Sequence, residues 1–215
     1  MPVIDSSPLA LQRSGLVEYE QALAIQRKIH GEVASGERPN TLMLLEHPSI
    51  YTAGKRTLAE ERPIGATRVL DVDRGGKITW HGPGQLVGYP IVRLKNPHEL
   101  VGFVREIESG LIEACKEFGI LGVRVAGRSG VWIVDDRGER KIAAIGIRVA
   151  SGTSMHGFAL NVNPDLSAFG EIIPCGISDA AVTSLAQELN RPIDVAEVTP
   201  VVEKFMYQAL TKVSA

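Results

Sequence analysis

The sequence predicts an α+β fold, in which helices flank a mixed or antiparallel β-sheet. Short apolar runs rich in Val, Ile and Leu are typical of strands, and they come in clusters along the chain. Segments with helical spacing do not alternate strictly with these runs, which argues against a doubly wound sheet. The chain has 215 residues, 44% of them hydrophobic and 22% charged, as is usual for a globular protein.

The first expected elements occupy the N-terminal half. In residues 17–34 the apolar side chains recur at helical spacing, and the segment 35–40, SGERPN, is a helix stop. Residues 41–47 are expected to form a short buried strand, and residues 69–76 a strand that ends in glycines. Residues 85–94 form another strand, in which Pro90 indicates an edge or a bulge because proline cannot donate to a β-ladder.

The C-terminal half continues the mixed pattern. Residues 99–118 give the clearest helix, with one apolar face made of Leu100, Val104, Ile107, Leu111, Cys115 and Phe118. Residues 130–149 predict a hairpin around a polar Asp-Asp-Arg-Gly turn, and residues 156–162 a further strand. Helices are expected at 180–190 and 195–212. Since the chain has no repeats or obvious linkers, we expect a single domain over 1–215.

Charge and hydropathy limit the classes of function. Lys and Arg number 23 against 25 Asp and Glu, which argues against a broad nucleic-acid-binding face. A local basic patch for an acidic protein partner remains open. The N-terminus lacks the pattern of a secretory signal, and no uncharged apolar run approaches the roughly 20 residues of a membrane span. We therefore expect a cytoplasmic protein that binds neither nucleic acid nor membrane, and whose two cysteines are free thiols.

The segment 74–90, RGGKITWHGPGQLVGYP, concentrates unusual chemistry. Glycines let a backbone approach a ligand closely, and bare N–H groups at Gly75–Gly76 can hold an anionic or carbonyl oxygen. Arg74 and Lys77 add positive charge, and Trp80 can wall off an apolar ligand. The segment matches neither the P-loop nor the dinucleotide-binding pattern. These residues alone favour neither a ligand site nor a plain glycine-rich hairpin turn.

The two cysteines have different settings. Cys115 lies on the apolar face of the helix 99–118, where a small hydrophobic role is the simplest account. Cys175 lies in the turn-like IIPCGISD, and a catalytic thiol there needs a neighbouring cation or base to ionise it. Lys141, at the start of a strand, is a candidate activator because a nearby cation favours the thiolate. The residues alone favour a loop cysteine without a role. Their spacing in sequence does not show that Cys175 and Lys141 lie close together.

The histidines give no metal-ligand pattern. His81 and His156 lie beside glycines, where each can line a pocket or satisfy the backbone of a turn. No HExxH or CxxC spacing is present, and the serine nucleophile motif GxSxG is absent. We therefore expect no metal and no cofactor.

Five segments together resemble the octanoyltransferases of lipoate biosynthesis, the lipoyl(octanoyl) transferase family: RGGKITWHGPGQLVGYP, GRSGVW, KIAAIGIRV, HGFALNV and PCGISDAAVTSL. The resemblance covers most of the chain. It implies a fold like the catalytic domain of the biotin and lipoate protein ligases. It also implies an acyltransferase that takes its acyl group from octanoyl-acyl carrier protein. The implied acceptors are lysines on lipoyl domains, in E2 subunits of 2-oxoacid dehydrogenases and in the glycine cleavage H protein.

The resemblance also implies the site residues. The family's catalytic cysteine falls on Cys175 and its lysine on Lys141, so that an acyl-Cys175 thioester forms and ping-pong kinetics without nucleotide are expected. Backbone N–H groups near Gly75–Gly76 or Lys77 are candidate oxyanion donors. The implied substrate-binding residues are Arg74, Gly75, Gly76, Lys77, Ile78, Thr79, Trp80, His81, Ala144, Ile145, Gly146, Gly157, Phe158 and Ala159.

Two other classes of function remain alternatives. An ATP-dependent ligase of the lipoate or biotin type would share the fold and use a lysine, but it would need no cysteine. In a non-catalytic module that binds acyl carrier protein or lipoyl domains, Cys175 would have no role in activity. A thiol-redox protein is the weaker third reading because no CxxC motif is present. Dependence on ATP and the effect of Cys175→Ser distinguish these classes.

Overall fold

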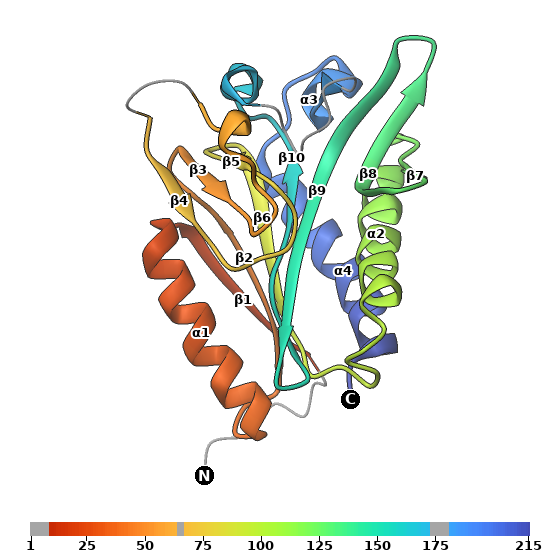
Figure 1. Ribbon diagram of the computed structural model, residues 1–215. Coiled ribbons are helices and arrows are strands. Elements are labelled where there is room, and N and C mark those ends of the chain that lie inside the picture. The colour runs from red at the N-terminus through yellow and green to blue at the C-terminus, as the bar shows by residue number, and fades with distance from the viewer. Residues whose placement is uncertain (1–8, 64–66, 173–180) are drawn as a thin grey trace.

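The computed structural model describes residues 9–63, 67–172 and 181–215 (Figure 1). The elements in chain order are β1 (Leu9–Leu16), α1 (Tyr19–Ser35), β2 (Asn40–Glu46), β3 (Ile50–Ala53), η1 (Ala59–Glu61), β4 (Val69–Asp71), β5 (Thr79–His81), β6 (Gln85–Ile91), α2 (Leu100–Glu117), β7 (Val123–Val125), β8 (Arg128–Asp135), β9 (Gly138–Ala150), β10 (Thr153–Asn161), η2 (Leu166–Glu171), β11 (Ala181–Val182), α3 (Leu185–Leu189) and α4 (Val195–Val213).

The main sheet is mixed, which confirms the predicted fold class. In the described part of the chain its strand order is β1-β2-β6-β10-β9-β8-β7, and β11 also pairs with β9. The β1–β2 and β11–β9 pairs are parallel, and the others are antiparallel. Helix α1 covers one face of the sheet, and α2 and α4 lie on the other (Figure 1).

Strand alternation divides the core between the two faces. In β2, Leu42 and Leu44 pack with the residues of α2 and α4, whereas Met43 and Leu45 pack with those of α1. A β-strand buried on both faces reads as a continuous apolar run. The run at 41–47 was predicted as a buried strand for this reason, and the structure confirms it.

A second, three-stranded sheet, β4-β3-β5, lies on the same side of the main sheet as α1 (Figure 1). It has its own small core, in which Tyr51, Ile78 and Trp80 pack with Phe169 and Ile172. The sequence expectation for this region was a strand over 69–76. The structure has only the three-residue β4 there, and strands β3 and β5 were not expected.

Pro90 was predicted to mark an edge or a bulge, and the structure excludes the edge. Strand β6 is interior, between β2 and β10. The Cβ that Gly157 lacks would lie 2.5 Å from Cδ of Pro90, so the side of the proline without an N–H faces β10. There β10 is irregular, because His156 has a φ of 57° and the hydroxyl of Ser154 donates to the carbonyl of Pro90. Strand β10 is therefore shaped so that it needs no backbone N–H donor from Pro90.

The remaining expectations are mostly confirmed. Helices α1, α2 and α4, the β8–β9 hairpin and β10 lie where the periodicity placed them. The expected helix over 180–190 is shorter, because β11 precedes it and α3 covers only Leu185–Leu189. Strand β1 pairs in parallel with β2, although the first 15 residues gave no clear pattern.

Candidate active site

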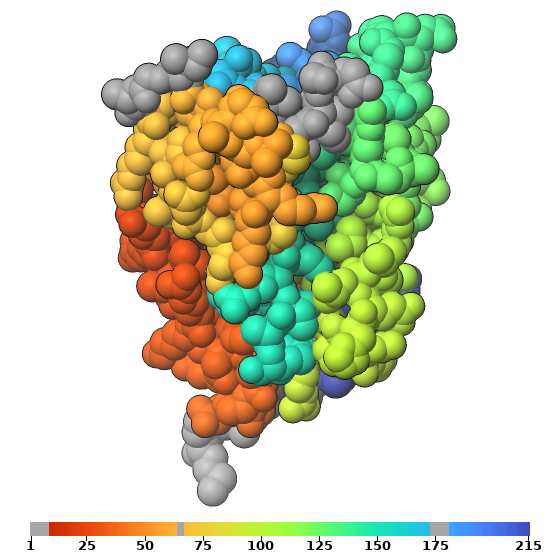
Figure 2. All heavy atoms as spheres, in the orientation of Figure 1, coloured from red at the N-terminus to blue at the C-terminus, as the bar shows by residue number. Residues whose placement is uncertain are grey.

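A cavity of about 260 Å³ lies against β6, β9 and β10, on the side of the sheet that α1 and the small sheet cover. Figure 2 shows the molecule hollowed between the orange region around β3 and the green β8. Three predicted binding segments, distant in sequence, meet here. The predicted residues that line the cavity are Arg74, Gly76, Lys77, Thr79, His81, Lys141, Ala144, Ile145, Gly146, Gly157, Phe158 and Ala159.

Some predicted residues lie elsewhere. Ile78 and Trp80 belong to the core of the small sheet, and the indole Nε1 of Trp80 donates to Ser49 Oγ at 2.9 Å. The N–H of Gly75 donates to the carbonyl of Ile147 at 2.9 Å. That N–H is therefore occupied, and the expectation that it serves as an oxyanion donor is corrected. Cys175 lies outside the described residues.

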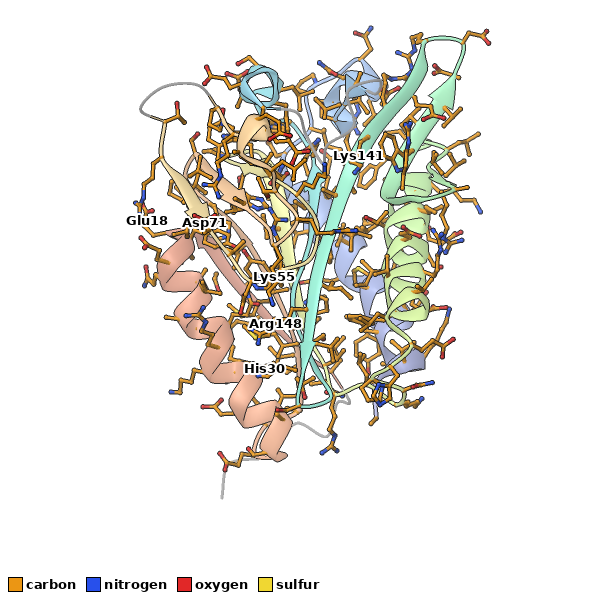
Figure 3. The ribbon with its side chains drawn as sticks, in the orientation of Figure 1. Glu18, His30, Lys55, Asp71, Lys141 and Arg148 are labelled. Atoms are coloured by element: carbon orange, nitrogen blue, oxygen red, sulfur yellow. The ribbon has the colours of Figure 1, made fainter. Side chains whose placement is uncertain are left out.

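Lys141 lies toward one end of the cavity, near the start of β9 (Figure 3). It is 7% exposed, and its Nζ lies 4.7 Å from the ring centroid of Trp132 on β8. The aromatic face attracts the ammonium and holds it against the sheet. The β10–β9 ladder reaches only Ala143, and β11 takes its place beside Lys141 through the Val182–Lys141 pair. Lys141 therefore lies where the neighbouring strand changes.

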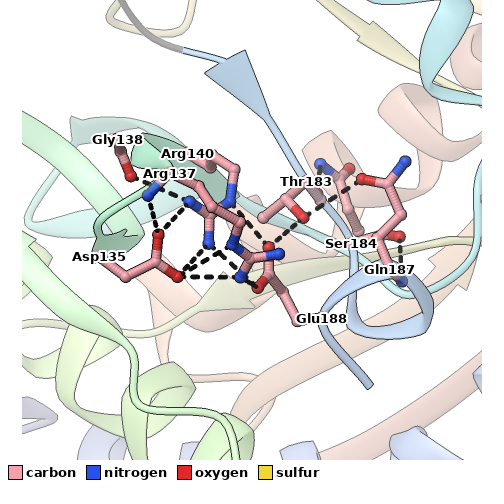
Figure 4. Close-up of polar contacts among 9 residues, drawn as sticks. Asp135, Arg137, Gly138, Arg140, Thr183, Ser184, Gln187 and Glu188 are labelled. Carbon is pink, nitrogen blue, oxygen red and sulfur yellow. Dashed lines mark hydrogen bonds and ion pairs between the residues drawn. The ribbon is translucent and has the colours of Figure 1, made fainter. Parts of the chain in front are cut away.

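A polar network fixes this end of β9 (Figure 4). Arg140 donates to Asp135 at 2.7 Å and to Glu188 at 2.9 Å, and Arg137 binds the same two carboxylates. Glu188 also accepts from the hydroxyl of Thr183 at 2.6 Å. Hydrogen bonds from Arg140 and Arg137 lower the pKa of Asp135, so its charge persists at neutral pH. The network ties the hairpin tip to α3 and to the residue that follows β11.

The cations of the glycine-rich segment are already engaged. The guanidinium of Arg74 is 7% exposed and donates to the carbonyls of Thr52 and Lys77, each at 2.7 Å, and to Thr52 Oγ1. Lys77 forms an ion pair with the buried Glu61, whose other oxygen accepts from the N–H of Leu58. Both cations therefore organise the loop, in addition to lining the cavity.

Glycine is required at position 157 by the sheet. A Cβ there would lie 2.0 Å from the carbonyl oxygen of Gly88 on β6, closer than any real contact. Gly88 has the same constraint, because its Cβ would meet the ring of Phe158 at 2.1 Å. Gly157 was expected to bind the substrate because of the family resemblance. The structure adds a tight contact between β6 and β10 beneath the cavity.

The inner end of the cavity is aromatic. Tyr19, at the start of α1, and Tyr89, on β6, both line it. The ring of Tyr19 lies 4.9 Å from that of His47 and 5.9 Å from that of His81, by centroids. Burial lowers the pKa of His47 to about 4 and that of His81 to about 3, the latter also through nearby His47. Both imidazoles are therefore neutral at pH 7.

Hydrogen bonds assign the tautomers of these histidines. Nδ1 of His47 lies 2.6 Å from the carbonyl of Val17, which can only accept, so Nε2 accepts from the hydroxyl of Tyr89 at 2.8 Å. Nδ1 of His81 lies 2.7 Å from Oε1 of Gln85, whose amide group donates to Asn161. Nδ1 of His81 therefore carries the proton, and its Nε2 offers a lone pair.

His156 is the most constrained residue of the site. It has a φ of 57°, is 1% exposed, and lines the cavity. Its Nε2 lies 2.7 Å from Asp73, which is also paired with Arg148. Within the described residues its buried Nδ1 has no hydrogen-bond partner. Burial lowers the pKa of His156 despite the nearby carboxylate, so the ring is neutral and Nδ1 is an acceptor.

Several lining residues were missed by the sequence analysis. Tyr19 belongs to a helix predicted only from its apolar spacing, and β6 was predicted as a strand without a stated face. The segment GRSG was quoted for the resemblance but not assigned to the site. The missed residues are Tyr19, Arg56, Val87, Tyr89, Gly127, Arg128 and Ser129.

Cys115 is buried as expected. It is 1% exposed in the core under α2, and burial raises the pKa of its thiol to about 12. It therefore stays protonated and away from the cavity. Among the described residues, no group of three or more His, Cys, Asp or Glu could hold a metal ion. No described helix is long and apolar enough to cross a membrane.

Comparison with solved structures identifies the fold. A putative lipoate protein ligase from T. acidophilum, solved with bound lipoic acid, superimposes with a TM-score of 0.73 over 94% of this chain and 86% of that chain, at 14% identity. Biotin protein ligase from Aquifex aeolicus superimposes with a TM-score of 0.51 over 95% of this chain and 68% of that chain, at 16% identity. The chain has the fold of these ligase catalytic domains, as predicted.

Sequence comparison then gives the family. The lipoyl protein ligase A/B catalytic domain matches residues 18–206, and the chain belongs to this family. An octanoyltransferase of Salinispora tropica is 58% identical over 200 residues, which cover 92% of this chain and 94% of that protein. An octanoyltransferase of Mycolicibacterium gilvum is 55% identical over 207 residues, 95% and 87% of the two chains. These relatives confirm the predicted resemblance and the prediction of an acyltransferase.

Proposed function

We propose that this chain transfers an octanoyl group from the phosphopantetheine thioester of acyl carrier protein to a lysine of a lipoyl domain. Relatives more than half identical over most of the chain are named octanoyltransferase, and this supports the acyl group. The observation that carries the proposal is the cavity, which has a buried lysine near one end and apolar and small residues along its floor. The acceptor and donor proteins follow from the resemblance.

The reaction has two acyl-transfer steps. The thiolate of Cys175 attacks the carbonyl carbon of the thioester, the bond to the pantetheine sulfur breaks, and that sulfur takes a proton. The amine of the acceptor lysine then attacks acyl-Cys175, the carbon–sulfur bond breaks, and an amide forms while the amine loses a proton. Covalent catalysis helps because a free amine is scarce at neutral pH, with a reference pKa near 10.4.

Lys141 is assigned to proton transfer. As an ammonium it favours the Cys175 thiolate and protonates the leaving sulfur, and as a neutral amine it takes a proton from the attacking lysine. Support for its proximity to Cys175 comes from the described residues on either side of that cysteine. Phe169 and Val182 both line a smaller cavity together with Lys141.

The octanoyl tail is assigned to the floor of the cavity. Ala144, Gly146, Gly157 and Ala159 carry little or no side chain, and they line it on β9 and β10. Burial of each methylene contributes about 0.8 kcal/mol, so the tail supplies several kcal/mol of gross binding free energy.

The proposal is tested by intact mass after incubation with octanoyl-acyl carrier protein and no nucleotide. We expect a gain of one octanoyl group, which disappears when a lipoyl domain is added. Cys175→Ser should show no gain. Cys115→Ala is the matched control and should be acylated like the wild type, because Cys115 is buried and protonated.

The other outcomes separate the alternatives. Product without a mass gain would mean direct transfer and would overturn the role of Cys175. No product until ATP and free octanoate are added would identify a ligase and would overturn the proposed function. Binding of acyl carrier protein or a lipoyl domain without any product would identify the non-catalytic module.

A further inference from the structure

The inner end of the cavity is closed by a wall of two tyrosines. Tyr19 is 3% exposed and Tyr89 is 4% exposed, and both line the cavity. They come from different elements, the first residue of α1 and the middle of β6. Both rings lie near His47, at centroid distances of 4.9 Å for Tyr19 and 6.0 Å for Tyr89. The wall therefore joins the helix to the sheet at the point where the cavity ends.

Hydrogen bonds make this wall rigid. The hydroxyl of Tyr89 donates to Nε2 of His47, and Nδ1 of His47 donates to the carbonyl of Val17. The N–H of Val17 in turn donates to the carbonyl of Glu46, at the end of β2. His47 is completely buried and is not among the residues that line the cavity. The hydroxyl of Tyr89 is thus held by His47 and, through Val17, is connected to the main sheet.

Strand register places this wall at a definite distance from Lys141. Gly88 pairs with Phe158, and Phe158 pairs with Ile145, so Tyr89 is level with Gly146 on β9. Lys141 lies five residues before Gly146, a rise of about 17 Å along the strand. The lysine side chain and the tyrosine rings take up part of that length.

An octanoyl tail fits within this length. An extended chain advances about 3.5 Å for every three bonds, so the seven carbon–carbon bonds of an octanoyl group span about 8 Å. A carbonyl held near Lys141 would direct the tail toward the tyrosine wall. Longer chains would then have to displace rings that are hydrogen-bonded and closely packed.

We propose that Tyr19 and Tyr89 set the length of the acyl group by forming a fixed stop at the inner end of the cavity. The inference rests on the proposed function and assigns its specificity. The tyrosines position the end of the tail and take no part in bond making. Ala159, which lines the same cavity and packs in the same core cluster as Tyr89, sets the depth of the floor beside the stop.

The test measures kcat/KM for transfer to a lipoyl domain from hexanoyl-, octanoyl-, decanoyl- and dodecanoyl-acyl carrier protein. We expect the wild type to prefer octanoyl. Tyr19→Leu should raise the decanoyl-to-octanoyl ratio about 15-fold, since each buried methylene contributes about fourfold. Tyr19→Phe keeps the ring and should keep the wild-type ratio. Ala159→Val should shift the preference in the other direction, toward hexanoyl.

Tyr51→Leu is the matched control for the loss of a buried tyrosine ring. Tyr51 is 6% exposed, packs in the small-sheet core and donates to the carbonyl of Ala168, away from the cavity. It should lower stability without changing the chain-length ratio. A control that shifted the ratio as much as Tyr19→Leu would overturn the inference.

The outcomes separate this inference from the proposed function. A wild type that transfers none of the four acyl groups would overturn the proposed function. If the wild type is active but Tyr19→Leu and Ala159→Val both keep its chain-length preference, the tyrosine stop is overturned and the proposed function is not. If circular dichroism shows that Tyr19→Leu does not fold, the Ala159→Val variant is the test. Its preference should shift toward hexanoyl, and any other result would overturn the stop.

Discussion

At the scale of single residues, Lys141 has the clearest assignment. It is buried, it lies over the ring of Trp132, and it pairs with the strand that follows the segment of Cys175. A lysine at the start of a strand is ordinarily solvent-exposed, so the sequence alone gave little support for a catalytic role of Lys141. Its burial at the cavity is the new observation, because it places the amine beside the space that the acyl group is proposed to occupy.

The prediction for this residue concerns rate rather than stability. Lys141→Ala should lower kcat for octanoyl transfer by at least 100-fold, the usual contribution of a positioned acid or base. Its far-ultraviolet circular dichroism should match that of the wild type. Lys204→Ala is the control, since Lys204 also lies over an aromatic ring, at 4.6 Å from Phe205, but is exposed. Near-normal turnover in Lys141→Ala would contradict a role of Lys141 in proton transfer.

Residues that act through distant partners could not be predicted. Lys77 was predicted to add charge to a ligand site, yet its ion pair with Glu61 joins positions 16 residues apart in sequence. Tyr19 is read from the sequence as the start of an amphipathic helix. Nothing in a helical period shows that its ring closes a cavity, because that depends on how α1 packs on the sheet.

At the scale of elements, the loop between β7 and β8 depends on one buried carboxylate. Glu108 of α2 is completely buried and accepts from Arg105 at 2.6 Å, Arg124 at 3.0 Å and the N–H of Gly130 at 2.9 Å. Gly130 has a φ of 113° and follows three cavity-lining residues. Arg124 belongs to β7 and Gly130 to β8, so the helix holds the two strands on either side of the loop, and residues 127–129 border the cavity.

Loss of this carboxylate should affect both stability and transfer. Glu108→Ala leaves the buried N–H of Gly130 unpaired, and we expect a loss of about 2 kcal/mol in the free energy of unfolding. We also expect a higher KM for the acyl donor, because the loop loses its anchor. Urea denaturation and steady-state kinetics measure the two effects. Glu113→Ala, on the exposed side of the same helix, should change neither; equal effects in both variants would contradict the anchor.

The elements themselves were largely predictable. Helices α1, α2 and α4 and the β8–β9 hairpin follow from periodicity and turn residues, which are local signals. Pro90 was misplaced at an edge because its compensation lies in another strand, at His156 and Ser154. The short strands β3, β5 and β7 pair over only a few residues, so packing decides them more than sequence pattern does.

At the scale of the whole molecule, the buried neutral histidines His47, His81 and His156 link stability to pH, because burial lowers the pKa of each. In the folded state the pKa of His47 is about 4 and that of His81 is about 3, against about 6.5 in an unfolded chain. Below pH 6.5 the unfolded state therefore binds protons that the folded state does not. Stability is full above pH 6.5 and falls as the pH drops toward 4.

We expect the free energy of unfolding to fall by about 1.4 kcal/mol per pH unit for each of these histidines between about pH 6 and pH 4.5. Urea denaturation at pH 7, 6 and 5 measures the slope. His47→Gln should make the slope smaller, because one of the contributing histidines is removed. His98→Gln should leave it unchanged, because His98 is exposed. A slope in His47→Gln equal to that of the wild type would show that other groups cause the acid sensitivity.

Strand β10 has a consequence for how such an enzyme can evolve. Near its end, Ala159 lines the cavity and packs in the core under α1, whereas Leu160 packs in the core beneath α2 and α4. Substitutions at Ala159 alter what the cavity admits, and those at Leu160 alter how firmly the chain folds. Selection can therefore change the substrate at one position while its neighbour stays under a separate constraint.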